Sequence, residues 1–167
     1  MTAGPLPFDA LIFDVGGVIV PHDNDVLHRR LTERCLFPNA QAWVSAAVRD
    51  RRYETGELPI AALHERLRRD AGYGLGWDGF VADCGRRLGL DQATLDFVER
   101  LAAVNRALLF SSTNREHWEH LLRLSDGRIG RFEACLSHEI GQAKPSAAAF
   151  AIVAARRRRS RALPLRR

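Results

Sequence analysis

Three short apolar runs, each followed at once by small polar or acidic residues, constrain the fold of this chain more than any other feature. Residues 10–13 run into Asp14, residues 107–110 run into Ser111, and residues 134–136 follow the same pattern. Apolar runs that stop at turn-forming residues are typical of buried strands. The segments between them carry apolar residues at helical spacing. Strands that alternate with helices predict an α/β fold with a parallel sheet.

Helical spacing marks the long stretch between the first two strands. We expect one helix to begin after Pro59 and a second to begin after Asp91, a good N-cap residue. Their apolar stripes are Ile60, Leu63, His64 and Leu67 in the first helix and Leu95, Val98, Leu101 and Ala102 in the second. A last helix begins after Pro145, and we expect Phe150 and Ala151 to face inward.

Large aromatic and cysteine side chains are scattered along the same region. We expect core or interface positions for the aromatic residues, and free buried thiols for the cysteines because no Cys-x-x-Cys pair is present. These residues are Trp43, Trp77 and Phe80, and Cys35, Cys84 and Cys135.

The positive charge lies at one end of the chain. Subtracting the seven arginines of segment 156–167 from the net charge of +5 leaves −2 for residues 1–155. We therefore expect no nucleic-acid binding by the body of the protein, because such a charge run is usually a solvated tail. Asp, Arg or Gly interrupts every apolar run, so no membrane span is expected. No basic segment with an apolar block opens the sequence, which predicts a cytoplasmic protein.

Polar residues follow the strands at the edge where open parallel sheets bind their ligands. A carboxylate at Asp14 can attack a phosphoryl group and form an aspartyl-phosphate. The two glycines after it permit a tight turn. Ser111 can donate its hydroxyl group, and the amides of residues 112–114 open a helix that suits phosphate oxygens. Lys144, the only lysine, can hold Asp14 and phosphate together as a compact cation.

Three segments in this order resemble the haloacid dehalogenase-like (HAD) hydrolase superfamily. They are FDVGGVIV at 13–20, FSSTNREHW at 110–118 and IGQAKPSAAAF at 140–150. The first is most similar to the phosphatase subgroup with Asp-x-Gly-[Gly/Asn]-Val, and YETGEL at 53–58 resembles its cap region. The resemblance covers residues 9–155.

The resemblance implies a doubly wound, Rossmann-like parallel sheet with an inserted helical cap. The core would comprise residues 1–20 and 101–155, and the cap residues 21–100, followed by an Arg-rich tail at 156–167.

The resemblance also implies a role for each motif residue. Asp14 would be the catalytic nucleophile and a Mg²⁺ ligand, the carbonyl of Gly16 a second metal ligand, Ser111 a phosphate donor and Lys144 the charge stabiliser. The residues that would bind substrate are Gly17, Ser112, Thr113, Asn114 and His117, although a cap-facing or surface position suits His117 equally well. The implied activity is Mg²⁺-dependent hydrolysis of a small phosphorylated metabolite.

Two departures from the family pattern predict reduced activity. The family's usual general acid, two residues after the nucleophile, is Gly16 here. No Asp or Glu follows Glu139, so the acidic fourth motif and its strand are absent. With one carboxylate left, we expect weakly held Mg²⁺. We interpret the chain as truncated, with C-terminal strands missing and the Asp14 strand left as an exposed edge open to self-association.

Two alternatives stay open on the sequence. A metal-independent 2-haloacid dehalogenase also uses an aspartate nucleophile and lacks the second aspartate, so Gly16 is compatible with it. An inactive truncated remnant would act only as an interaction module through its exposed edge. The Gly-Gly-Val and Ser-Ser-Thr-Asn sequences favour the phosphatase.

Overall fold

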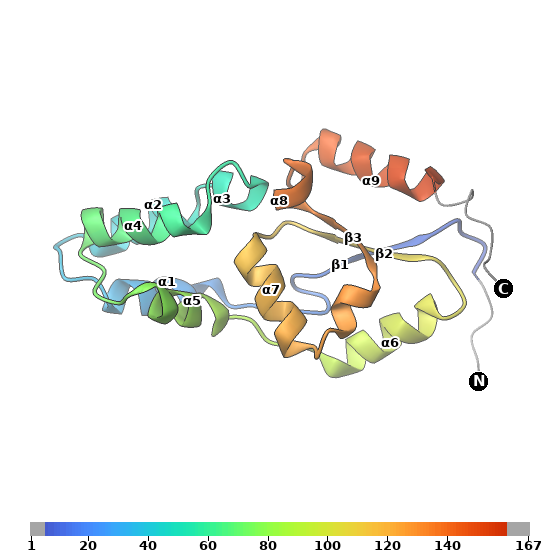
Figure 1. Cartoon of the computed structure of the whole chain (residues 1–167), viewed down its shortest axis with the longest axis horizontal. Coiled ribbons are helices and arrows are strands. Elements are labelled where there is room, and N and C mark those ends of the chain that lie inside the picture. The colour runs from blue at the N-terminus through green and yellow to red at the C-terminus, as the bar shows by residue number, and fades with distance from the viewer. Residues whose placement is uncertain (1–5, 160–167) are drawn as a thin grey trace.

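A parallel sheet carries the strand ends on which the motifs lie (Figure 1). The computed structural model describes residues 6–159. Within them the strands are β1 (Leu11–Asp14), β2 (Ala107–Ser111) and β3 (Glu133–Leu136), in the order β1-β2-β3. The register places Asp14 beside Phe110. The predicted α/β fold with a parallel sheet is confirmed. The expected Arg-rich tail at 156–167 is wrong at its start, because residues 156–159 continue the last helix, and residues 160–167 lie outside the described residues.

Helices cover both faces of the sheet. On one face lie α6 (Gln92–Ala102), α7 (Arg115–Leu124) and the short 3-10 helix η1 (Arg128–Arg131), packed against Leu109 of β2. On the other face α9 (Ala147–Arg159) covers Phe110 of β2. Successive strand residues point to opposite faces, so β2 contributes to both layers. This is the expected doubly wound, Rossmann-like arrangement.

The chain between β1 and β2 leaves the sheet and forms a separate helical lobe, shown at the left of Figure 1. Its helices are α1 (Asn24–Glu33), α2 (Ala40–Val48), α3 (Arg52–Thr55), α4 (Ile60–Ala71) and α5 (Trp77–Gly85). The lobe has its own apolar core, which includes Leu27, Leu31, Val44, Leu63, Leu67 and Phe80. The predicted stripe of α4 is buried as expected.

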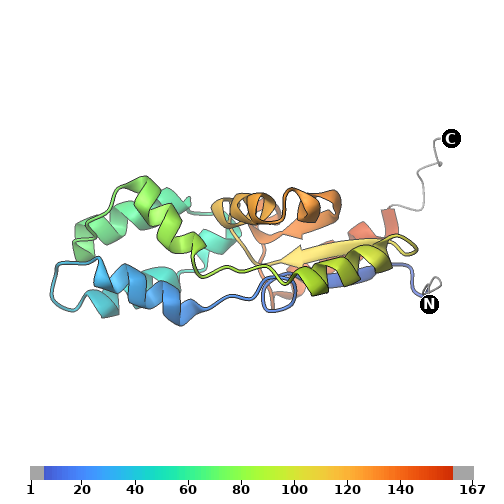
Figure 2. The same ribbon diagram turned by 90° about the horizontal axis from the view of Figure 1, so that it is seen from below.

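Two connecting segments join this lobe to the sheet, and Figure 2 shows them running side by side. Gly89 donates its N–H to the carbonyl of Pro21 at 2.8 Å, and Asp23 donates to the carbonyl of Arg87 at 3.1 Å. The paired segments therefore hold the helical lobe over one end of the sheet.

The packing of α6 bears on where the insertion ends. Asp91 caps this helix as expected, since its Oδ1 accepts from the N–H of Thr94 at 3.0 Å. Leu95 and Val98 pack with sheet residues and not with the insertion. That packing favours a boundary near residues 88–91 over the expected boundary at residue 100. The division into domains remains a proposal.

Two sequence expectations about α9 are wrong. Phe150 is 51% exposed and Ala151 is also exposed, whereas Ala149 and Val153 are buried against β2 and β3. The helix begins at Ala147, and the residues that face the sheet are Ala149 and, one helical turn later, Val153. Phe150 instead lies edge-on to Phe110, with 5.4 Å between ring centroids.

The expected burial of the aromatic and cysteine residues is confirmed for some of them and not for others. Phe80 is fully buried, but Trp43 and Trp77 are partly exposed, so only Phe80 occupies the expected core position. Cys84 and Cys135 are buried free thiols as expected, and Cys35 is a half-buried one.

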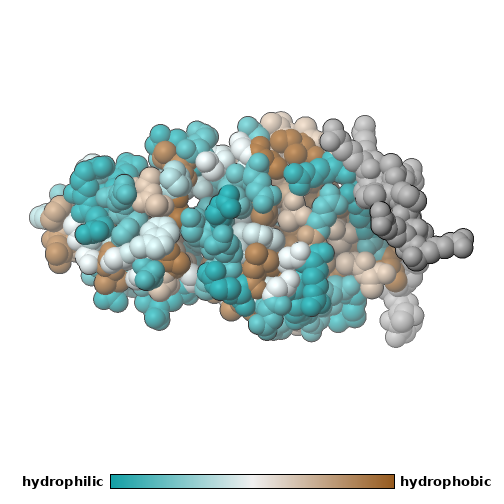
Figure 3. Space-filling view, in the orientation of Figure 1, coloured by the Kyte–Doolittle hydropathy of each residue, from teal (hydrophilic) through white to brown (hydrophobic). Residues whose placement is uncertain are grey.

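β1 forms one edge of the sheet among residues 6–159, where no further strand pairs with it and none follows β3. Ile12 at its centre is 45% exposed. Figure 3 shows further hydrophobic surface over α9. An exposed hydrophobic edge is what the sequence predicted. No helix within the described residues is long and apolar enough to span a membrane.

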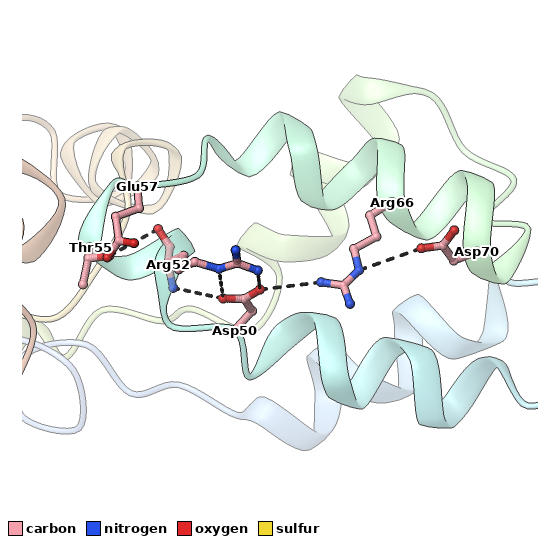
Figure 4. Close-up of polar contacts among 6 residues, drawn as sticks. All are labelled: Asp50, Arg52, Thr55, Glu57, Arg66 and Asp70. Atoms are coloured by element: carbon pink, nitrogen blue, oxygen red, sulfur yellow. Dashed lines mark hydrogen bonds and ion pairs between the residues drawn. The ribbon is translucent and has the colours of Figure 1, made fainter.

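The segment around α3 is one place where the insertion contacts the sheet domain. Asp50 forms ion pairs with Arg52 at 2.6 Å and Arg66 at 3.6 Å, and the Arg52 hydrogen bond lowers the pKa of Asp50 (Figure 4). Exposed ion pairs of this kind contribute little free energy. The tighter constraint is Gly56, where a methyl group would lie 2.6 Å from the carbonyl oxygen of His138 in α8 (Ser137–Ile140).

We predict that Gly56→Ala lowers the free energy of unfolding by about 3 kcal/mol, from backbone strain at its positive φ plus this clash. Gly127 is the matched control, because it has a similar φ and no atom within 4 Å of an added methyl group. Gly127→Ala should cost about 1 kcal/mol, from backbone strain alone. Urea unfolding measures both, and equal losses would contradict the close contact.

Candidate active site

The first predicted site residue, Asp14, ends β1 and meets Lys144. The Nζ atom of Lys144 lies 2.5 Å from Oδ1 of Asp14 and donates to the carbonyl of Phe110 at 3.1 Å. The N–H of Val15 donates to the same Oδ1 at 2.7 Å. The Asp14 side chain is 46% exposed. The lysine therefore joins the ends of β1 and β2 while leaving the carboxylate open to a ligand.

The loop that carries Lys144 is held from both lobes. Its backbone N–H donates to the Ser112 hydroxyl at 3.0 Å. Arg51 of the insertion donates a short hydrogen bond to the Lys144 carbonyl. The position of the ammonium group thus depends on the sheet domain and on the helical lobe together.

The loop after Asp14 is a tight turn. The N–H groups of Ile19 and Val20 donate to the Val15 carbonyl at 3.0 and 2.9 Å, and Gly17 donates to the carbonyl of Val20 at 2.9 Å. Gly17 has φ +77°, which only glycine adopts at low cost. The turn places Gly16 on the wall of the cleft described below.

The second motif ends β2 and begins α7. Ser111, the last residue of β2, is 4% exposed. The N–H of Thr113 donates to the Ser137 hydroxyl at 2.8 Å. Asn114 is the N-cap of α7, where its Oδ1 accepts from the N–H of His117 at 2.9 Å. The side-chain oxygen of Asn114 is therefore engaged in capping the helix.

A cleft of about 920 Å³ separates the two lobes, which is the size of a metabolite site. Five predicted residues line it, namely Gly16, Ser111, Ser112, Thr113 and His117. Asp14, Gly17, Asn114 and Lys144 are not among its lining residues. The N–H of the lining residue Val15 donates to Oδ1 of Asp14, so the carboxylate lies at the border of the cleft.

Arg87, which follows α5, lines the cleft and had no sequence signal. Its Nη1 donates to Oδ1 of Asn24 at 2.6 Å, and its Nη2 donates to Nδ1 of His117 at 3.3 Å. Burial lowers the pKa of this guanidinium. The insertion also contributes His28, Arg29 and Arg49 to the cleft wall. Which insertion side chains face the cleft depends on how its helices pack, and sequence spacing does not show that.

His117 is a neutral ring in this environment. Burial, then the charge of Arg87, then His120 lower its pKa to about 3. Because Nδ1 accepts from Arg87, Nε2 carries the ring proton. That Nε2 atom is buried without a hydrogen-bond partner in the described structure.

Metal ligands are few. Within residues 6–159, no three His, Cys, Asp or Glu side chains lie where they could hold a metal ion together. The donors at the cleft border are the Asp14 carboxylate and the backbone around Gly16. Mg²⁺ accepts one or two protein carboxylates with water and phosphate oxygens in the remaining positions. This donor set fits a weakly held Mg²⁺ ion.

Comparison with known proteins gives matches among solved structures alone. No protein-family profile matches the chain, and no curated protein sequence does. A HAD family enzyme from Bacteroides thetaiotaomicron, in complex with magnesium and inorganic phosphate, is similar with a TM-score of 0.73. The sequences are 20% identical, and the match covers 88% of this chain and 77% of that one.

A HAD-like family hydrolase from Porphyromonas gingivalis is also similar, with a TM-score of 0.70 and 20% identity over 88% of this chain and 75% of that one. The chain therefore has the fold of the HAD-like enzymes, as the motifs led us to expect.

The neutral state of His117 predicts how stability depends on pH. Its folded pKa of about 3 lies below the unfolded value of about 6.5, so the unfolded chain binds protons first as pH falls. His117 should therefore lower the free energy of unfolding by up to about 1.4 kcal/mol per pH unit as pH falls from about 6.5 toward 3.

In His117→Gln this loss should disappear, so the variant should gain stability relative to the wild type as pH falls. Urea unfolding of both proteins between about pH 7 and pH 4 measures the difference. Parallel pH profiles would show that His117 titrates normally in the folded protein.

Proposed function

We propose that this protein is a HAD-like hydrolase that removes phosphate from a small phosphorylated metabolite through an aspartyl-phosphate on Asp14. The observation that carries the proposal is the 2.5 Å contact between Lys144 Nζ and Asp14 Oδ1 at the border of the cleft. The Bacteroides enzyme with magnesium and inorganic phosphate adds support, since its fold is similar.

In the first step a carboxylate oxygen of Asp14 attacks the phosphorus atom. A bond forms between them as the bond from phosphorus to the leaving oxygen breaks, and the departing alkoxide takes a proton from water. Water then attacks the aspartyl-phosphate, which releases inorganic phosphate and restores the carboxylate. Among the described residues, both contacts of this carboxylate are made at Oδ1, which favours Oδ2 as the attacking atom.

Lys144 and Ser111 stabilise charge around the phosphoryl group. The ammonium group of Lys144 holds the attacking carboxylate and offsets negative charge on the phosphate oxygens. Ser111 can donate its hydroxyl to a phosphate oxygen, and the amides of Ser112 and Asn114 lie at the start of α7, where a helix favours anions. The amide of Thr113, which the sequence also suggested, is engaged by the Ser137 hydroxyl.

Asp14 and the Gly16 carbonyl would hold Mg²⁺. The ion, when bound, neutralises phosphate charge. Because Asp14 is the one carboxylate that the described residues supply at the site, we expect weak metal binding and modest activity. Gly16 supplies no side chain to protonate the leaving group, so phosphate esters with good leaving groups should react fastest.

The test is phosphate release from p-nitrophenyl phosphate with and without Mg²⁺. Asp14→Asn should lower turnover at least about 100-fold, because the amide is a poor nucleophile. Asp78→Asn, on the exposed surface of α5, is the matched control and should keep the wild-type rate.

The other outcomes point to the alternative functions. Equal rates for Asp14→Asn and the wild type would contradict the proposal and favour an interaction module, which the exposed β1 edge suits. Halide release from a 2-haloacid that persists in EDTA, without phosphate release, would favour the metal-independent dehalogenase.

A further inference from the structure

Arg87 is a largely buried cation whose hydrogen-bond partners are both neutral, and the charge of Glu54 acts on it only from beyond ion-pair distance. Its guanidinium donates to the amide oxygen of Asn24 and to the neutral ring of His117. None of the ion pairs among residues 6–156 includes Arg87. Of its five N–H groups, the two hydrogen bonds use two, and Nε is buried with no partner.

The buried carboxylate of Asp83, also in the helical lobe, does have charged partners. Asp83 is 4% exposed, and Arg30 and Arg34 lie 3.7 and 3.9 Å from its carboxylate oxygens. The hydroxyl of Tyr73 donates to the same carboxylate at 3.1 Å. Buried charges are costly unless they are paired, and the lobe supplies that pairing for Asp83. Arg87 has no such ion pair, and unlike Asp83 it lines the cleft.

The position of Arg87 suits contact with a ligand. It lies on a segment that connects the insertion to the sheet domain, where its carbonyl accepts from the N–H of Asp23 at 3.1 Å. Its side chain lines the same cleft as Ser111, Ser112 and Thr113. A ligand whose phosphate lies at the strand ends therefore shares the cleft with this guanidinium.

We propose that Arg87 binds a carboxylate of the substrate, so that the substrate is a phosphorylated carboxylic acid. This inference rests on the proposed function, because the phosphate end of the ligand is assigned to Asp14 and Ser111. The planar guanidinium matches a carboxylate in shape, and one carboxylate neutralises its single charge. His117 positions the guanidinium by accepting from Nη2.

Calorimetry with non-hydrolysable phosphonates tests this in the full-length chain with Mg²⁺. The ligands are phosphonoacetate and 3-phosphonopropionate, each compared with the alkylphosphonate in which a methyl group replaces the carboxylate. At least one carboxylate ligand should bind about tenfold more tightly than its partner, as a charge-assisted hydrogen bond implies. Tighter binding of methylenebisphosphonate than of either carboxylate ligand would overturn the assignment to a carboxylate.

The tenfold ratio should vanish in Arg87→Gln. Arg86→Gln is the matched control, because Arg86 is exposed and does not line the cleft, and it should keep the ratio. If Arg87→Gln fails to fold, Arg87→Lys, which keeps the charge but loses the fork, should reduce the ratio.

The wild-type comparison separates the two proposals. Alkylphosphonates that bind without any gain from the carboxylate would overturn the role of Arg87 and leave the phosphatase proposal intact. No binding of any phosphonate would contradict both.

Discussion

The contact between Lys144 and Asp14 is the interaction on which the rest of the site depends. It exists because a parallel sheet brings the carboxyl ends of β1 and β2 to one edge, where Lys144 also reaches the carbonyl of Phe110. The lysine is fixed in turn by Ser112 from the sheet domain and by Arg51 from the helical lobe. The register of the sheet and the position of the helical lobe therefore both determine where the Lys144 ammonium group meets the Asp14 carboxylate.

The two lobes have different roles in the proposed reaction. In the proposed reaction the sheet domain would bind phosphate through short side chains and backbone amides at its strand ends. The helical lobe supplies the far wall of the cleft, where Arg87 forms no ion pair with the described residues. Such a division explains how one chemical site can serve a particular substrate through residues far away in the sequence.

The sequence predicts the sheet and the motif positions well, because they depend on local signals. The strand ends at Asp14 and Ser111, and the cap at Asp91, follow from short-range patterns that tertiary packing did not override. The prediction of which face of α9 packs inward was wrong, because no local signal distinguishes Ala149 from Phe150 in an Ala-rich helix. Sequence reasoning also missed Arg87. Its place in the cleft wall and its lack of an ion pair depend on tertiary packing, which the local sequence does not show.

The most direct measurement of the central claim is mass spectrometry of acid-quenched enzyme during turnover of p-nitrophenyl phosphate. The account predicts a phosphoryl group on the peptide that contains Asp14, and it should accumulate because Gly16 offers no side chain to activate the water. The phosphoryl group should be absent from Asp14→Asn. Turnover with no phosphorylated peptide, or with phosphate on another residue, would contradict Asp14 as the nucleophile.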